Sequence, residues 1–136
     1  MPSSTGHRDR VPLAVGIDTF SIVLFVAPGL RSHDQDGAFT AVLETAAPFL
    51  LGLGAGWLVA RAWRRPVSVL TGLVVWPVTI LVGMVVRNAV FDRGTATSFV
   101  VVATLFVGAF VVGWRIVLGV VDRRRAQSSG GPLTAR

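Results

Sequence analysis

Residues Val67 to Val86 read VSVLTGLVVWPVTILVGMVV, a run of twenty residues that contains no charged side chain. At a rise of about 1.5 Å per residue, a helix of this length spans about 30 Å, which matches the hydrocarbon core of a bilayer. Three stretches of similar apolar character lie around it, at about residues 11–30, 38–60 and 96–121. Such uninterrupted apolar runs are typical of membrane spans rather than of buried core helices. The sequence therefore predicts an all-α integral membrane bundle of four transmembrane helices.

The composition agrees with a membrane protein. Of 136 residues, 52% are hydrophobic and 15% are charged, and the mean hydropathy is +0.67, whereas soluble domains carry about 25% charged residues. The absence of Cys excludes disulfides and Cys-ligated zinc. A net charge of +6 is also found in nucleic-acid-binding proteins. Basic residues that flank apolar spans are better explained by the positive-inside rule and by anionic lipid headgroups. We therefore expect the lipid bilayer as the partner, and no nucleic acid.

The polar segments between the predicted spans set the orientation. Residues 1–10 are expected to form a disordered N-terminus and residues 122–136 a flexible basic tail, so the transmembrane domain covers residues 11–121. Nine arginines fall in the N-terminus, the loop at residues 61–66 and the tail, whereas three fall in the other two loops. The positive-inside rule then places both termini in the cytoplasm, with the bundle crossing the plasma membrane. Asp18 in the first span argues against a cleaved signal peptide.

Three charged side chains lie inside the predicted spans: Asp18, Glu44 and Arg115. A charge at the membrane centre costs about 2.5–3.5 kcal/mol on insertion scales, so it needs a partner, a wet cavity or protonation. Asp18 lies about 10 Å and Arg115 about 9 Å from the cytoplasmic ends of their spans, so these two are expected to form an ion pair. Glu44 lies about 9 Å below the outer surface. Its candidate partner is Arg87, at the outer end of the third span.

Two roles fit these charges. In the first, a transport role, one of the acids binds and releases a proton in each transport cycle. In the second, a structural role, two ion pairs fix the order and register of the helices. We favour the structural role, because an acid that is permanently paired with Arg makes a poor proton carrier. Glu44 is the better carrier candidate if Arg87 points to water.

Small residues in two spans are candidate helix-packing positions. Gly52 and Gly56 form a G-x-x-x-G pair, and Ala109 and Gly113 form a similar pair in the fourth span. In lipid, helices associate through close packing of small residues and through polar contacts. We favour packing inside the monomer's own bundle for both pairs, with homodimerisation as the alternative.

Pro48 and Pro77 lie inside the second and third predicted spans. A proline frees the carbonyl four residues earlier and bends the helix. For Pro48 that carbonyl belongs to Glu44, and kinks beside charged residues occur at binding sites of transporters. Prolines are also tolerated in membrane helices, and we interpret both as tolerated kinks, with a binding site at Pro48 as the alternative.

The loop after the first span contains His33 beside Asp34 and Asp36. Together these side chains could hold a metal ion weakly, but we favour a solvated loop and predict no metal centre and no cofactor. The chain also lacks the G-x-S-x-G, H-E-x-x-H, P-loop and dinucleotide-binding motifs. We therefore expect no catalytic residues and no enzyme.

Short motifs in a fixed order carry a resemblance to a known family. They are Asp18 ahead of Arg31-Ser32-His33, Pro48-Phe49-Leu50 ahead of Gly56-Trp57, Arg64-Arg65-Pro66 ahead of Gly72-Leu73-Val74-Val75-Trp76, Gly83-Met84 ahead of Arg87, and Ser98-Phe99-Val100 ahead of Gly113-Trp114-Arg115. Over residues 12–120 the chain resembles the small prokaryotic membrane proteins called domain of unknown function 3054. The resemblance implies a four-span integral membrane protein of unknown function, with Asp18, His33, Arg87 and Arg115 as matching polar positions.

Two functions are consistent with these features. The first is a structural or accessory membrane protein held by intramembrane ion pairs. The alternative is a small proton-coupled transporter or permease that acts as an oligomer, similar in size to the small multidrug resistance transporters. That family uses a Glu in its first span with Tyr nearby, whereas this chain has Asp18, no Tyr and an Arg at similar depth. We favour the first function, with a second copy or another membrane protein as candidate partner.

Overall fold

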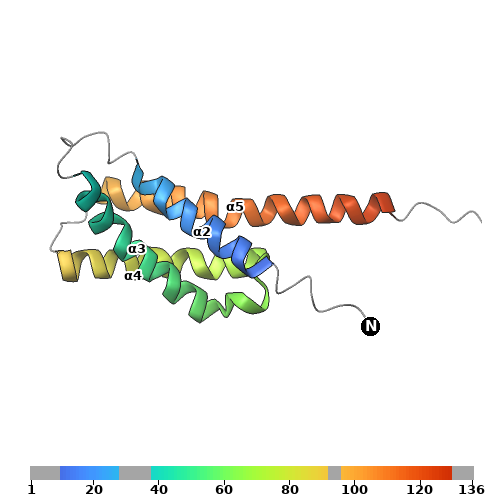
Figure 1. Cartoon of the computed structure of the whole chain (residues 1–136), viewed down its shortest axis with the longest axis horizontal. Coiled ribbons are helices and arrows are strands. Elements are labelled where there is room, and N and C mark those ends of the chain that lie inside the picture. Colours follow the sequence, from blue (N-terminus) through green and yellow to red (C-terminus); the bar gives the residue numbers. More distant parts are fainter. Residues whose placement is uncertain (1–9, 28–37, 92–95, 130–136) are drawn as a thin grey trace, which may run out of the picture.

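The computed structural model describes residues 10–27, 38–91 and 96–129, and these ranges contain helices but no strand (Figure 1). The elements are α2 (Arg10–Val26), α3 (Ala38–Ala60), the 3₁₀ helix η2 (Ala62–Arg64), α4 (Val69–Phe91) and α5 (Thr97–Ser129). The all-α prediction is therefore confirmed.

Three of these helices are long and apolar enough to cross a membrane. They are α3 over Val42–Ala60, α4 over Val69–Val90 and α5 over Thr97–Ser128. Helix α2 has 17 residues, or about 26 Å of helix, which is at the lower limit for a membrane span.

The helix ends differ from the predicted spans mainly in α5. The prediction of a flexible tail from residue 122 is wrong for residues 122–129, because α5 continues to Ser129. Asp122 at this point accepts a hydrogen bond from Arg10 of α2 at 2.8 Å, and the Arg, Ala and Gln that follow are good helix formers. The predictions for residues 1–9, 28–30 and 130–136 lie outside the described residues.

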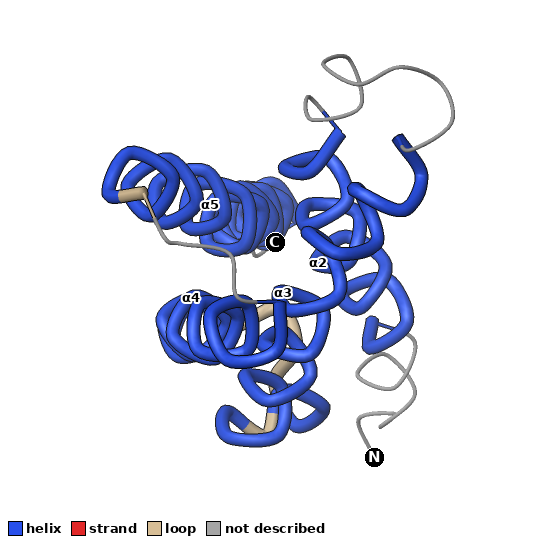
Figure 2. The backbone as a smooth tube through the Cα atoms, turned by 90° about the vertical axis from the view of Figure 1, so that its left-hand side faces the viewer, coloured by secondary structure: helices blue, strands red, loops and turns tan. Residues whose placement is uncertain are grey.

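The four helices pack as a ring. Helix α2 contacts α3 and α5, and α4 also contacts α3 and α5, as the view along the bundle in Figure 2 shows. The most extensive interface is between α3 and α4. Helix α5 projects beyond the other helices at its C-terminal end (Figure 1).

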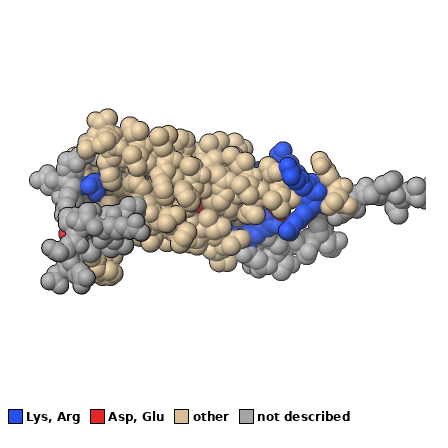
Figure 3. Space-filling view, turned by 90° about the horizontal axis from the view of Figure 1, so that it is seen from above, with Lys and Arg blue, Asp and Glu red and all other residues tan. Residues whose placement is uncertain are grey.

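The outer surface of the bundle is apolar. Large side chains such as Phe39, Leu58 and Leu70 are 75%, 68% and 72% exposed, whereas Asp18 and Arg115 are completely buried. In Figure 3 most of the blue arginine side chains gather at one end of the molecule, and a smaller blue patch lies near the opposite end, with an uncharged surface between them. This distribution, apolar outside and polar inside, is the one expected for helices that face lipid.

Candidate functional site

Asp18 of α2 and Arg115 of α5 meet inside the bundle, where both side chains have 0% exposure. The Nη1 of Arg115 donates to Oδ1 of Asp18 at 2.8 Å, and Nη2 donates to Oδ2 at 2.7 Å. Two parallel charge-assisted hydrogen bonds are the strongest arrangement of a guanidinium and a carboxylate. The contact that the matched depths predicted is therefore present in the structure.

Two indole groups complete the surroundings of the carboxylate. Trp57 of α3 donates its Nε1–H to Oδ2 of Asp18 at 3.0 Å, and Trp114 of α5 donates to Oδ1 at 2.9 Å. Each carboxylate oxygen thus accepts two hydrogen bonds. The carboxylate joins α2 to both α3 and α5, so it links three helices at one point.

Two further N–H groups of Arg115 donate to the backbone. Its Nε donates to the carbonyl of Pro66 at 2.9 Å, and Nη1 also donates to the carbonyl of Val111 at 2.6 Å. Pro66 lies in the connection between α3 and α4. A Cβ at Gly72 would lie 2.9 Å from Cδ of Arg115, so the glycine leaves room for the arginine to pass α4. Arg115 therefore ties the α3–α4 connection to the same centre.

Sequence reasoning missed the two tryptophans and Pro66 as partners of the ion pair. It assigned no hydrogen-bond partner to either tryptophan, whereas both indoles donate to Asp18. An indole N–H at membrane depth needs an acceptor, and this requirement is the signal that could have identified them. Trp63, by contrast, is 47% exposed, which suits an indole at a membrane interface.

Replacing either tryptophan by phenylalanine is expected to destabilise the bundle. Trp57→Phe and Trp114→Phe each remove one donor from a buried carboxylate, and a hydrogen bond to a charged group contributes about 1.5–3 kcal/mol. Thermal unfolding of the purified protein in detergent measures the loss. Trp63→Phe is the matched control and is expected to change stability by less than about 0.5 kcal/mol. Equal midpoints for all three variants would contradict the role of the indoles.

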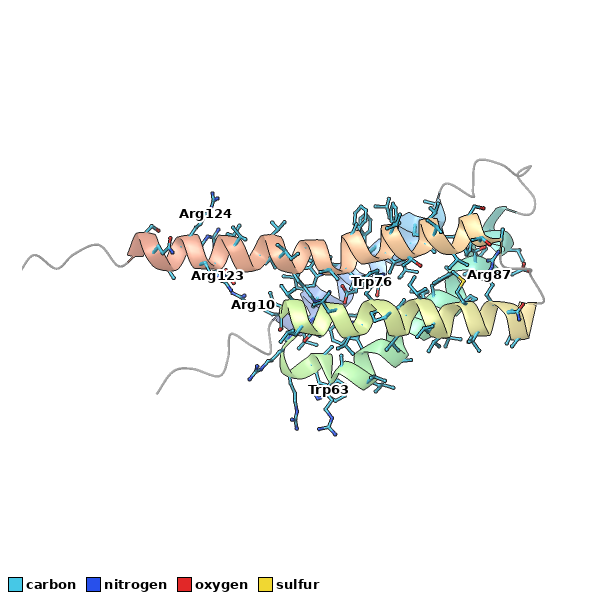
Figure 4. The ribbon with its side chains drawn as sticks, turned by 180° about the vertical axis from the view of Figure 1, so that it is seen from behind. Arg10, Trp63, Trp76, Arg87, Arg123 and Arg124 are labelled. Carbon is cyan, nitrogen blue, oxygen red and sulfur yellow. The ribbon has the colours of Figure 1, made fainter. Side chains whose placement is uncertain are left out.

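The second predicted ion pair is that of Glu44 with Arg87. The guanidinium carbon of Arg87 lies 4.4 Å from the ring centroid of Phe99, within the range of a cation–π interaction. Figure 4 shows Arg87 at the end of the bundle opposite to Arg10. Glu44 is half-buried on α3. Its pairing with Arg87 stays a prediction.

The two small-residue pairs face in different directions. A Cβ at Gly52 would collide with the carbonyl oxygen of Thr79, and one at Gly56 would lie 2.9 Å from that of Val75. The G-x-x-x-G face therefore packs against α4 within the same chain.

Pro48 and Pro77 lie inside α3 and α4 as expected.

The pair in α5 points away from the bundle. Ala109 is exposed, and no atom lies within 4 Å of a Cβ built at Gly113. The expectation that this pair packs inside the monomer is therefore wrong. The inward stripe of α5 consists of residues four apart that are all fully buried, namely Ala103, Val107, Val111 and Arg115. Gly108 is a further small residue that α5 turns inward, where the ring of Trp76 would lie 2.6 Å from an added Cβ.

The loop residues His33, Asp34 and Asp36 lie outside the described residues. Within the described ranges, no three His, Asp or Glu side chains are grouped so that they could hold a metal ion.

Comparison with known proteins places the chain in a family. No curated protein and no solved structure matches the chain. A family model described as "Protein of unknown function (DUF3054)" matches residues 15–118. This match covers well over half of the chain and includes the ion pair, both of its tryptophan donors and Pro66. The chain therefore belongs to the DUF3054 family of proteins of unknown function.

Proposed function

We propose that this protein is a four-span integral membrane protein of the plasma membrane with a structural or accessory role rather than an enzymatic one. In this proposal, the pair of Asp18 and Arg115 fixes the order and depth of the helices. The apolar outer surface and the three helices of spanning length support the membrane location.

The packing of α2 supports its role as the fourth span. Its charged residue in mid-helix, Asp18, is paired with Arg115 inside the bundle, which offsets part of the cost of placing this charge at membrane depth. The contact of Arg10 with Asp122 joins the start of α2 to the C-terminal part of α5. The start of α2 and the C-terminal part of α5 therefore lie at the same end of the bundle, and the arginine distribution supports a cytoplasmic location for that end.

The observation that carries the structural role is that the hydrogen-bond acceptor positions of the Asp18 carboxylate are all occupied. Both carboxylate oxygens accept two hydrogen bonds each, and the side chain has no exposure. A proton carrier must exchange its proton with water during each cycle, and Asp18 is poorly placed to do so. This geometry favours a structural ion pair over the proton-coupled transporter.

Cysteine labelling tests the orientation, because the natural chain contains no Cys. Ser128→Cys and Thr97→Cys place thiols at the two ends of α5, at positions where both native side chains are exposed. A membrane-impermeant maleimide added to intact cells is expected to label Thr97→Cys, and Ser128→Cys only after permeabilisation. Labelling of both variants in intact cells, or the reverse pattern, would contradict the proposed topology.

The structural role is tested by removing both charges together. A protein that carries Asp18→Asn and Arg115→Gln is expected to remain in the membrane and to recover stability relative to the single variants. A proton carrier would lose its function with Asp18→Asn alone while the fold stayed intact.

A further inference from the structure

A groove lies between α2 and α3 on the outside of the bundle and has a volume of about 300 Å³. It is lined by Val15, Thr19, Leu50, Leu53, Gly54 and Trp57. Gly54 is exposed, and no atom lies within 4 Å of a Cβ built on it, so the missing side chain is what opens the groove. The lining is apolar apart from Thr19, and the groove opens toward the surroundings of the bundle, which in a membrane are acyl chains.

The groove extends toward the arginine-rich end of the bundle. Trp57 lies four residues before Arg61, and Val15 lies five residues after Arg10, which correspond to about 6 Å and 7.5 Å of helix. Arg61 and Arg64 are exposed. Figure 4 shows Arg10 and Trp63 at this same end. The groove is therefore apolar along its length, and exposed arginines follow its Trp57 end along the chain.

Positive charge dominates this end of the molecule. Seven described arginines lie there, namely Arg10, Arg61, Arg64, Arg65, Arg123, Arg124 and Arg125. Among the described residues, Asp122 is the acid at this end, and it is bound to Arg10. Guanidinium groups bind phosphate oxygens through paired hydrogen bonds, and basic sites between helices on the cytoplasmic side bind anionic headgroups.

We propose that this groove is a binding site for a phospholipid with an anionic headgroup. One acyl chain lies between α2 and α3, and the phosphate binds at Arg61 and Arg64. The proposal rests on the membrane location in the proposed function. A second copy of the chain is a poorer occupant, because two-fold packing about an axis along the membrane normal would bring two arginine clusters together at the same depth.

Native mass spectrometry of the full chain in a neutral detergent measures lipid binding directly. The probes are phosphatidylglycerol and phosphatidylcholine with identical acyl chains. The wild-type protein is expected to prefer phosphatidylglycerol. Arg61→Gln and Arg64→Gln should each lower that affinity about fivefold, the equivalent of about 1 kcal/mol per basic residue, with little effect on phosphatidylcholine. Arg123→Gln, on the projecting end of α5, is the matched control and should leave the preference unchanged.

A second variant tests the groove itself. Gly54→Leu fills the open space without meeting another atom at its Cβ. It is expected to weaken the binding of both lipids by a similar factor, so that the preference between headgroups is retained. Gly113→Leu also points its Cβ into open space, on α5, and serves as the control for the same change in helix propensity.

Three results would overturn the lipid site. The first is equal affinity for the two lipids, or equal effects of Arg61→Gln and Arg123→Gln. The second is a Gly54→Leu protein that binds lipid normally but changes its oligomeric mass, which would identify a second copy as the occupant. The third is displacement of the lipid by an equal concentration of inorganic phosphate, which would indicate a free-anion site. Thermal unfolding of the same samples shows whether the bundle is intact, and cysteine labelling reports separately on the topology.

Discussion

Asp18→Asn and Arg115→Gln are each expected to lower the free energy of unfolding in detergent by about 3–5 kcal/mol, because each leaves a buried partner without its counter-charge. With Asp18→Asn, Arg115 keeps a full positive charge at 0% exposure. With Arg115→Gln, the carboxylate keeps the two indole donors but loses both guanidinium bonds.

The double variant is expected to recover much of this loss. Replacing a buried ion pair as a whole is often nearly neutral, whereas removing one partner is costly. The coupling energy between contacting residues should be about 0.5–3 kcal/mol. Unfolding of the wild type, the two single variants and the double variant in the same detergent gives this energy as a double-mutant cycle.

An exposed ion pair in the same protein provides the control. Arg10 and Asp122 form a bond of similar length, but their side chains are 45% and 43% exposed, so their coupling should be about 0–1 kcal/mol. If the coupling of Asp18 with Arg115 is near zero and Asp18→Asn leaves the fold intact, the structural role of the pair is wrong. Proton flux in reconstituted vesicles would then be the next measurement.

Gly52→Ala is expected to destabilise the α3–α4 interface by about 1–3 kcal/mol, the typical cost of overpacking. The added Cβ would collide with the carbonyl oxygen of Thr79 and would lie 3.0 Å from the amide nitrogen of Gly83. Both groups belong to the backbone of α4, so they cannot rotate away as a side chain could. The two helices must separate, and van der Waals contact, on which their association in lipid depends, is lost.

Gly54→Ala is the matched control for Gly52→Ala, two residues further along the same helix. Its Cβ points into open space, and alanine favours the helix by up to about 1 kcal/mol over glycine. Stability should therefore be unchanged or slightly higher. Thermal midpoints of both variants in one detergent measure the difference. If Gly52→Ala unfolds at the same temperature as Gly54→Ala, α3 and α4 do not make the close contact described above.

The sequence by itself determined the helical fold, the apolar spans and the matching depths of Asp18 and Arg115. These properties are local. The length of an apolar run sets the length of a helix in a bilayer, and the position of a charge along that run sets its depth. Two buried charges of opposite sign at one depth have a strong energetic reason to meet, so the pair could be predicted without knowledge of the helix order.

The tertiary structure alone decided how each helix is rotated. In lipid an apolar residue suits the inner and outer faces equally, so the pattern of hydrophobic residues does not identify the inner face. For this reason Gly52 and Ala109 belong to similar motifs, yet the first faces α4 and the second faces outward. Polar contacts resolve the ambiguity. The bonds of Arg115 to Asp18 and Pro66 set the rotation of α5, and that rotation brings Trp114 to the carboxylate. The packing of α2 against α3 brings Trp57 to the same carboxylate.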